Sequence, residues 1–418
     1  MASVFGLDFG TTNSAMALGK NGATEILRID PHSPSPNILR SILYFGEGRR
    51  SYVGHEAIHH YLEEGGSGRL MQSIKSLLPS DSFQSTVIHR RPYDLETLIS
   101  IILKTMKERG EMVGGSTIDS VVMGRPAFFS ADEKKDHLAA ERLRAAAALA
   151  GFREIRFEYE PVAAAMTYEE SLDSSAEKVV LVGDLGGGTS DFSIMKVRGG
   201  KHLPDRRSDV LALAGVYVGG DTFDGRIMWS KVVRYFGLNA HYRSLTDEWL
   251  ETPRHLFVTM CQWHLIPRLR EEKGMIREMR ARSDDPTALR RLEHIIEDNY
   301  GFVLFRAIEK AKIELSSRET SSIMFSERDL LIDDPITRME FEAVIDDASK
   351  KLEATVEEAF QQAGLTPGSI DAVILTGGSS QVPKIRNSFV KRFGADKLVP
   401  TNALTSVVYG LGLSASRT

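Results

Sequence analysis

The chain has 418 residues, with 42% hydrophobic and 26% charged side chains and a net charge of -5. The length predicts two domains, and the near balance of 52 basic against 57 acidic residues argues against a dedicated nucleic-acid-binding protein. A single cysteine excludes an internal disulfide, and the sequence shows neither a signal peptide nor an apolar run long enough to cross a membrane, so we expect a cytoplasmic protein with no membrane and no nucleic-acid partner.

The first half of the chain predicts strands and turns, followed by alternating strands and helices. Apolar runs predict strands over 3–8, 14–19 and 24–29. The dipeptide Asn21-Gly22 is a strong hairpin signal between the last two. Apolar residues at helical spacing predict a helix over 68–80, ended by Pro79. The next predicted elements are a buried helix over 97–110, a strand over 118–126, a long amphipathic helix over 131–152, and a strand leading into a helix over 154–170.

The second half begins with a strand, a turn and a strand over 178–197, and it is mostly helical over 223–320. It ends with a strand, a glycine turn and a helix over 371–393. Residues 6–18 and 182–195 share one plan: an apolar strand, an aspartate, an apolar residue, glycine and small residues, then a second strand. Two copies this far apart predict two similar lobes, not a solenoid of short repeats.

Each copy of this repeat places an aspartate at the mouth of a loop with almost no side chains. Glycines let the backbone turn tightly and let successive N–H groups surround a phosphate, and Thr11, Thr12 and Thr189 add hydroxyl donors. A carboxylate beside such a loop repels phosphate unless a cation lies between them, so Asp8 and Asp184 make most sense as holders of a hydrated Mg²⁺. One such loop alone would more simply be a hairpin turn with an incidental acid. Two matched loops and a third glycine turn near the C-terminus favour the phosphate site.

Other nucleotide and metal motifs fit less well. The patterns GxxxxGK[ST] and GxGxxG after a strand are both absent, which excludes a P-loop NTPase and a simple dinucleotide binder. Residues 55–59, HEAIH, match a zinc motif in which two histidines on one helix face bind the metal. No persuasive third ligand follows, and Leu62 stands where the longer zinc motif needs glycine. We therefore expect His55 and His59 to be surface residues on a short helix.

Five separated segments carry a resemblance that covers essentially the whole chain: LDFGTTNS, SIKSLL, YEPVAAAMTY, DLGGGTSDFSI and LTGGSSQVPKI. Together they resemble the nucleotide-binding domain of the seventy-kilodalton heat-shock (DnaK-type) chaperone family, within the actin and sugar-kinase ATPase superfamily. The resemblance implies an α/β, actin-like ATPase fold with two lobes, each built on an RNase-H-like mixed sheet flanked by helices. It implies lobe I over 1–165, with 376–418 returning to it, and lobe II over 166–375 with a helical subdomain at about 221–305.

The resemblance also implies a site for ATP or ADP with Mg²⁺. Asp8 and Asp184 would hold the metal through water, and the implied catalytic residues are Lys75, Glu160, Asp191 and Asp184. The residues implied to bind the nucleotide are Gly10, Thr11, Thr12, Asn13, Gly186, Gly187, Gly188, Thr189, Gly219, Gly220, Asp221, Glu309, Lys312, Ser316, Gly377, Gly378 and Ser379. On its own, Lys75 would read as a solvated helix residue and Glu160 as a first-turn acid that favours the helix dipole.

Two departures from the family pattern bear on function. The sequence ends at GLGLSASRT, where the chaperones continue with an apolar linker, a substrate-binding domain and a helical lid. We therefore expect a truncated, lid-less type that does not bind unfolded peptides in the family's usual way. Ile313 and Gln381 stand where the family usually has the two arginines that sandwich adenine. We expect weaker adenine binding or a relaxed choice of base, by about 0.5–2 kcal/mol per lost contact.

The resemblance favours a chaperone-like protein that binds ATP, hydrolyses it slowly and works through a protein partner or co-chaperone. Two alternatives use the same fold: an actin-like filament, which would pellet with ATP, and a small-molecule kinase, whose ADP production would be stimulated by a sugar or an acid. A fourth hypothesis is a degenerate ATPase that only binds nucleotide. Lys75 and the EPVAAA segment favour the first hypothesis, and the intact acids argue against the last.

Overall fold

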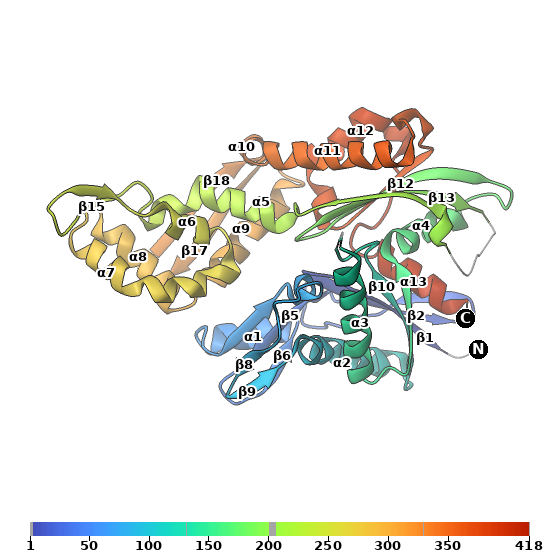
Figure 1. Ribbon diagram of the computed structural model, residues 1–418, viewed down its shortest axis with the longest axis horizontal. Coiled ribbons are helices and arrows are strands. Elements are labelled where there is room, and N and C mark those ends of the chain that lie inside the picture. Colours follow the sequence, from blue (N-terminus) through green and yellow to red (C-terminus); the bar gives the residue numbers. More distant parts are fainter. Residues whose placement is uncertain (1–2, 131, 200–205, 329, 418) are drawn as a thin grey trace. The chain divides into compact units, whose positions relative to one another are not determined.

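The computed structural model describes residues 3–130, 132–199, 206–328 and 330–417 (Figure 1). The chain forms two compact units. Unit 1 comprises Met1–Leu62, Gly68–Gly219 and Lys351–Thr418, and unit 2 comprises Glu63–Ser67 and Gly220–Lys350. The expected boundary between two lobes near residue 166 stays a prediction. The mixed α/β class expected from the sequence is confirmed, because unit 1 is built on mixed sheets flanked by helices.

The first large sheet of unit 1 has the strand order β11-β10-β1-β2-β3, with β4 also paired to β2. Its strands are β1 (Val4–Phe9), β2 (Asn13–Lys20), β3 (Ala23–Ile26), β4 (Leu39–Arg40), β10 (Ser120–Arg125) and β11 (Glu154–Tyr159). The predicted hairpin is confirmed, because Lys20 pairs with Ala23 around a two-residue turn. Asn21 and Gly22 in this turn both have positive φ, as the tight hairpin turn requires.

The second large sheet of unit 1 repeats this topology. Its strands are β12 (Glu177–Leu185), β13 (Ser190–Arg198), β14 (Val210–Val216) and β19 (Ala372–Thr376), in the order β14-β13-β12-β19. In each sheet an antiparallel hairpin, β1–β2 or β12–β13, is extended by a parallel strand beside its first strand, β10 or β19. Asp8 and Asp184 are each the last residue but one of the first strand. The repeat seen in the sequence is therefore a repeat of structure.

Two helices with small side chains join the sheets of unit 1. Helix α13 (Ser406–Ser416) packs against β1, β2 and β10, and α4 (Glu160–Glu170) packs against β12, β13 and β19. The two helices also pack against each other, and a single apolar core runs from Val4 and Val122 through α4 to Val180 and Ile374. Their close approach depends on Gly410, where an added Cβ would lie 1.8 Å from the carbonyl oxygen of Ala163.

Other helices cover the outer faces of the sheets. Helices α2 (Leu95–Gly114) and α3 (Glu133–Leu149) pack together and share the core that contains Phe5 and Leu7 (Figure 1). Helix α2 begins where Asp94 accepts a hydrogen bond from the backbone N–H of Thr97 at 2.8 Å. On the second sheet, the side chains of α12 (Pro383–Phe393) and the C-terminal part of α11 (Asp346–Ala363) meet in a row of stacked phenylalanines.

The prediction of one helix over 68–80 is wrong. The segment forms β7 (Arg69–Gln72), paired antiparallel to β5 (Ile42–Phe45), and then the short 3-10 helix η1 (Ile74–Leu77). Ser73 separates the two with a φ of 57°, which an α-helix does not allow. Pairing with β5 therefore overrides the helical spacing of the apolar residues. The small elements around it are β6 (Ser51–Val53), α1 (His55–Glu63), β8 (Thr86–Ile88) and β9 (Arg91–Tyr93).

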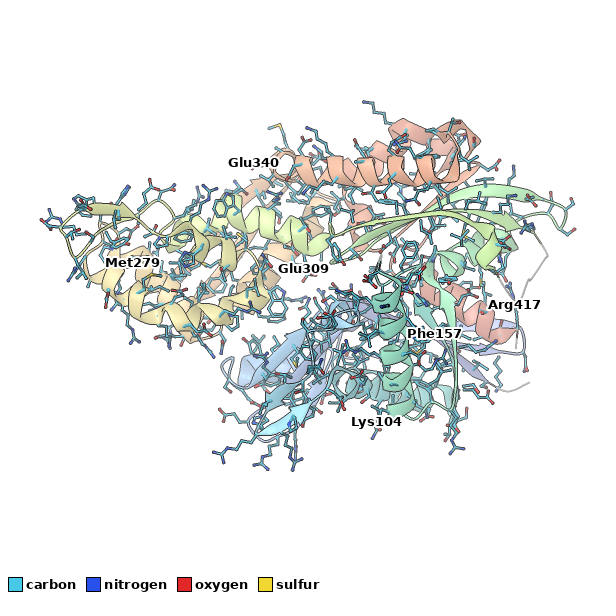
Figure 2. The ribbon with its side chains drawn as sticks, viewed as in Figure 1. Lys104, Phe157, Met279, Glu309, Glu340 and Arg417 are labelled. Carbon is cyan, nitrogen blue, oxygen red and sulfur yellow. The ribbon has the colours of Figure 1, made fainter. Side chains whose placement is uncertain are left out.

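Unit 2 is mostly helical, as predicted, but contains two hairpins. Its elements are α5 (Gly220–Ile227), η3 (Met228–Val232), η4 (Val233–Phe236), β15 (His241–Arg243), β16 (Trp249–Glu251), α6 (Arg254–Met260), η5 (Trp263–Glu272), α7 (Lys273–Ala281), α8 (Pro286–Glu297), α9 (Gly301–Leu315), β17 (Thr320–Glu327), β18 (Leu330–Thr337) and α10 (Arg338–Val344). Helix α9 packs on β17. The N-terminus of α10 is closed by a capping box between Thr337 and Glu340, and Lys231 donates to the same glutamate at 2.8 Å (Figure 2 labels Glu340).

No helix in the described part of the chain has the length and apolar character needed to cross a bilayer.

The packing of α13 on α4 predicts the effect of one methyl group. We expect Gly410→Ala to lower the free energy of unfolding by about 1–3 kcal/mol, because the new Cβ overlaps the backbone of α4. The control is Gly114→Ala in α2, where the nearest atom to a new Cβ, on Leu18, lies at 3.5 Å. That variant should be neutral or gain up to about 1 kcal/mol. Chemical denaturation followed by circular dichroism measures both, and equal stabilities would contradict the packing described.

Candidate functional site

Three aspartates of unit 1 lie at the ends of strands. Asp184 on β12 is the direct cross-strand partner of Asp191 on β13, and Thr376 on β19 flanks Asp184 on its other side. The hydroxyl of Thr376 donates a hydrogen bond to Asp184 Oδ1 at 2.9 Å, and that of Thr189 donates to Asp191 Oδ2 at 3.2 Å. Strand pairing therefore fixes Asp184 just before the 186–189 turn and Asp191 just after it.

A buried ion pair completes this group of charges. Lys75 in η1 contacts Glu160 in the first turn of α4, with 2.8 Å between Nζ and Oε1, and both side chains are at most a tenth exposed. Pro161 follows Glu160 in the first turn of the helix, where proline is favoured. Gly124 on β10 makes room for this glutamate, because a Cβ there would lie 3.1 Å from Glu160 Cγ. The two residues, each implied only by the resemblance, are thus in direct contact.

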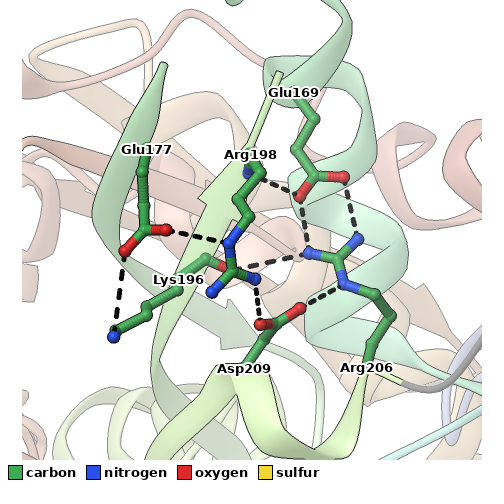
Figure 3. A network of polar contacts seen from close by, with 6 residues as sticks. All are labelled: Glu169, Glu177, Lys196, Arg198, Arg206 and Asp209. Atoms are coloured by element: carbon green, nitrogen blue, oxygen red, sulfur yellow. Dashed lines mark hydrogen bonds and ion pairs between the residues drawn. The ribbon is translucent and has the colours of Figure 1, made fainter. Parts of the chain in front are cut away.

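The far end of α4 is fixed by a second ion-pair network (Figure 3). Glu169 in the last turn of α4 accepts hydrogen bonds from two nitrogens of Arg206, at 2.5 and 3.0 Å. The guanidinium of Arg206 also contacts Asp209, which in turn pairs with Arg198 of β13. Since Glu169, Arg206 and Asp209 are buried, this network ties α4 firmly to the second sheet. It thereby fixes the helix that presents Glu160.

Burial, and after it the gathering of negative charge, raises the pKa values of the three aspartates. Burial and the charges of Glu160 and Asp184 raise the pKa of Asp8 to about 8, although Lys75 opposes the shift. Burial and neighbouring carboxylates likewise raise the pKa of Asp184 to about 6 and that of Asp191 to about 7. Burial lowers the pKa of Lys75, but the charges of Glu160 and Asp8 outweigh burial and raise it overall. One lysine does not balance four carboxylates.

Three glycine turns lie beside these acids. The first is 10–13 after β1, the second is 186–189 after β12, and the third is 377–379 after β19. The Gly186–Thr189 turn closes with a hydrogen bond of 2.9 Å from the N–H of Gly186 to the carbonyl of Thr189. A Cβ at Gly219 would lie 2.5 Å from the carbonyl oxygen of Gly187, and one at Gly377, which has a φ of 78°, would lie 2.2 Å from that of Leu185. Only glycine fits where backbones approach this closely.

Side chains tie the same turns together. Ser379 in η7 (Gly378–Gln381) donates to the carbonyl of Gly186 at 2.9 Å. The methyl group of Thr11 lies 3.7 Å from the position a Cβ would take on Gly188, so the first turn faces the second. The predicted phosphate loops are therefore brought together within unit 1.

The first turn, between β1 and β2, is equally tight. A Cβ on Gly10 would lie 2.1 Å from the carbonyl oxygen of Asn13. Ser41 holds the turn from outside, because its hydroxyl donates to the carbonyl of Gly10 at 2.7 Å and its N–H donates to that of Thr12 at 2.9 Å. Among the described residues the buried hydroxyl of Thr12 has no hydrogen-bond partner. An unpaired buried hydroxyl is unfavourable, so a ligand acceptor would stabilise it.

These features test whether the residues suit magnesium and phosphate. The described residues contain no group of three or more histidine, cysteine, aspartate or glutamate side chains placed to hold a metal ion together. Magnesium needs no such group, because it usually keeps several waters and takes one or two carboxylates together with substrate phosphates. The excess of carboxylates calls for a cation, and the glycine turns with the unpaired Thr12 hydroxyl suit an anion. The donor set fits a hydrated divalent cation bound with a phosphate ligand.

The residues expected at the nucleoside end lie in unit 2. Glu309, Lys312, Ile313 and Ser316 share one face of α9 and its C-terminal cap, at positions i, i+3, i+4 and i+7 (Figure 2 labels Glu309). Lys312 Nζ contacts Asp224 Oδ2 at 2.8 Å and the carbonyl oxygen of Gly220 at 3.1 Å. Ile313 is 58% exposed, which leaves an apolar side chain on an otherwise polar face. Gln381 is exposed at the end of η7 in unit 1.

Two residues that contact the candidate site residues were not predicted as site residues from the sequence. Asp224 contacts Lys312, and Thr376 contacts Asp184. Asp224 is buried and holds Lys312, and burial raises its pKa to about 7 although Lys312 opposes the shift. Its place three residues after Asp221, on the first turns of α5, was the available signal. Thr376 stands at the end of β19 immediately before two glycines, in the same pattern as the aspartates of the other loops.

The HEAIH segment forms α1, and His59 is exposed as expected. His55 is only partly exposed, because its side chain points towards a buried acid. Its backbone N–H donates to the fully buried Asp30 at 3.0 Å, and its Nδ1 lies 3.4 Å from the same carboxylate oxygen. Asp30 therefore fixes the start of α1, which explains why His55 points inward.

Comparison with known proteins gives a consistent picture. The model of the Hsp70 protein family matches residues 80–241 and 297–416. The chain is 28% identical over 420 aligned residues to the chaperone protein DnaK of Thermosipho melanesiensis, across 99% of this chain and 59% of that protein. DnaK of Thermosipho africanus is also 28% identical, across 99% of this chain and 58% of that protein. The chain thus spans about three fifths of the length of these curated relatives.

The raised pKa of Asp8 predicts how stability depends on pH. Below its ordinary pKa of 3.8 Asp8 is protonated whether folded or unfolded, and up to about 8 only the folded state keeps the proton. The stability contributed by this raised pKa is therefore complete in acid and lost as the pH rises to about 8. We expect Asp8→Asn, without nucleotide or metal, to stabilise the fold by about 1–3 kcal/mol near pH 8 and much less near pH 5.

Thermal unfolding across this pH range measures the effect. Asp396→Asn, on the exposed Asp396 of unit 1, is the control and should leave the melting temperature unchanged at every pH. A destabilised Asp8→Asn protein at alkaline pH would contradict the electrostatic account.

Proposed function

We propose that this chain, which belongs to the Hsp70 protein family, binds ATP and ADP with Mg²⁺ and hydrolyses ATP slowly. The observation that carries the proposal is the cluster of Asp8, Glu160, Asp184 and Asp191 around Lys75, next to three glycine turns of the same unit. The family match favours this function over a filament or a small-molecule kinase. We further propose that the protein acts in the cytoplasm with a protein partner or co-chaperone, as part of a chaperone system.

We assign the phosphate-binding end of the site to residues of unit 1. Asp8 and Asp184 would hold hydrated magnesium, which neutralises phosphate charge when it is bound. The backbone N–H groups of Gly186–Thr189 and the hydroxyls of Thr11 and Thr12 would donate to the phosphate oxygens. Gly10 and Asn13 shape the first turn, and Gly377, Gly378 and Ser379 shape the third. Each of these groups is a donor or a glycine that allows close approach, as phosphate binding requires.

Hydrolysis needs a positive charge near the terminal phosphate and an oriented water. Lys75 supplies the charge, and its ion pair with Glu160 fixes the ammonium group at 2.8 Å from that carboxylate. Asp191 or Glu160 would accept a hydrogen bond from the attacking water and orient it. The low exposure of the pair excludes competing waters and strengthens its electrostatic effect.

In unit 2, we propose that Glu309 and Lys312 bind the ribose hydroxyls, with Ser316, Gly220 and Asp221 completing the nucleoside side. Ile313 offers an apolar surface without hydrogen-bonding groups, so we expect this face of α9 to discriminate only weakly between nucleotide bases.

Calorimetric titration with ATP, ADP and GTP, each with and without Mg²⁺, tests the proposal. We expect ATP and ADP to bind, removal of Mg²⁺ to weaken ATP binding at least about tenfold, and GTP to bind within about tenfold of ATP. Phosphate release from the same sample then measures turnover. Absence of nucleotide binding, or ATP binding that ignores Mg²⁺, would refute the proposed site.

Lys75→Ala separates hydrolysis from binding. We expect the rate of ATP hydrolysis to fall at least about a hundredfold, because the substitution removes a preorganised charge at the terminal phosphate. The affinity for ADP should change little, since ADP lacks that phosphate. Lys104→Ala is the control: this exposed lysine of α2 pairs only with Glu108 among the described residues (Figure 2). Unchanged turnover in Lys75→Ala would instead indicate a protein that only binds nucleotide.

Asp224→Asn tests the nucleoside end. Asp224 should position Lys312 without touching the nucleotide, so its loss should raise the KM for ATP about tenfold and leave kcat nearly unchanged. Asp224→Glu should restore part of the affinity. Asp347→Asn, which breaks the exposed pair with Arg226 in the same unit, is the control and should change neither constant. A loss of kcat alone in Asp224→Asn would rule out a positioning role.

A further inference from the structure

Five arginines gather on one edge of unit 1, and no part of the nucleotide site uses them. Arg49 and Arg50 lie in the turn between β5 and β6, Arg69 begins β7, and Arg90 and Arg91 lie at the tip of the β8–β9 hairpin. All five are exposed. We call this group the arginine edge.

Packing around Phe45 brings these segments together. Phe45, the last residue of β5, is the direct cross-strand partner of Arg69, and the N–H of the next residue, Gly46, donates to the carbonyl of Arg50 at 3.1 Å. The ring of Phe45 contacts the ring of Tyr93 at 5.1 Å between centroids, and Tyr93 follows Arg91 by two residues on the same face of β9. One aromatic contact therefore joins the two hairpins that carry the arginines (Figure 1 shows β5, β6, β8 and β9).

None of these five side chains makes an ion pair or a side-chain hydrogen bond with any residue that the structure describes. Two other arginines of unit 1 behave differently: Arg125 pairs with Asp136 at 2.8 Å, and Arg142 donates to three backbone carbonyls and faces Glu96. The arginine edge thus presents five guanidinium groups whose charge the fold does not neutralise.

The backbone conformation gives an independent reason to expect that these arginines serve a purpose other than folding. Arg49 has a φ of 61°, and the two residues of the β8–β9 turn, His89 and Arg90, have φ values of 49° and 64°. Such positions favour glycine, asparagine or aspartate, as in the Asn21-Gly22 turn of the same unit. Both hairpins therefore carry an arginine where the backbone would be relaxed by glycine. Local folding does not account for these side chains.

We propose that the arginine edge binds a segment rich in aspartate and glutamate on a partner protein. The planar guanidinium fork matches a carboxylate with two parallel hydrogen bonds, and five uncompensated forks form a strip that suits several carboxylates in sequence.

An acidic protein segment fits this surface better than a nucleic acid does. Single strands bind through aromatic side chains free to stack on bases, whereas the rings of Phe45 and Tyr93 pack against each other. The chain as a whole carries a net charge of -5, which opposes the approach of a polyanion that is much longer than the strip.

The test uses the full chain and a short fluorescent peptide of alternating glutamate and leucine, followed by fluorescence anisotropy. We expect binding that weakens as salt is raised, and a loss of at least about tenfold in affinity for the double variant Arg90→Glu with Arg91→Glu. The matched control reverses two exposed arginines elsewhere, Arg268→Glu with Arg386→Glu, and should bind like the unmodified chain. Equal losses in both double variants would overturn the proposal.

Glycine substitutions separate binding from folding. Arg49→Gly and Arg90→Gly relieve the positive φ angles, so their melting temperatures should stay the same or rise while peptide affinity falls. ATP affinity should not change in either variant, which keeps this test independent of the proposed nucleotide site. The same chain is also tested with a single-stranded oligonucleotide and with vesicles of anionic lipid. Tighter binding of either one than of the peptide would overturn the proposal.

Discussion

The constraint that shapes the candidate site is electrostatic: four carboxylates, three of them half-buried, surround one lysine. Asp8, Asp184 and Asp191 have raised pKa values because burial and mutual repulsion disfavour their charged forms, and the pairing of Lys75 with Glu160 offsets only part of this. Such an arrangement is unfavourable for the isolated chain and favourable once a cation is bound. Stability lost in this way is typical of sites whose geometry serves a ligand.

The repeated sheet topology is what makes this concentration of charge possible. Each sheet ends the first strand of its hairpin in an aspartate and a glycine turn, and the parallel strand β19 adds Thr376 beside Asp184. Helices α4 and α13 approach through small residues such as Gly410, which brings the two hairpins within one packed unit. The ion pairs of Glu169 at one end of α4 hold the helix that carries Glu160 at the other (Figure 3). Packing therefore sets the geometry that the charges alone would oppose.

The fold and the candidate site could be predicted from the sequence to different degrees. The Asn21-Gly22 hairpin and the strand-turn-strand around Asp184 follow from local signals, because turn chemistry acts over a few residues. The roles of Lys75 and Glu160 came only from resemblance to a family, and their contact across 85 residues was not predicted, since no local pattern encodes it. The helix predicted over 68–80 failed because β5 offers a pairing partner that spacing cannot reveal. Asp224 was missed because its role depends on a lysine that lies far along the chain.

The most direct test of the electrostatic account is a crystal structure of the chain with ATP or a non-hydrolysable analogue and with Mn²⁺ in place of Mg²⁺. Anomalous scattering then locates the metal without ambiguity. The account predicts an anomalous peak joined through water to Asp8 and Asp184, with the phosphates against the Gly186–Thr189 turn. A bound nucleotide with its metal away from these carboxylates, or with its phosphates away from that turn, would contradict it.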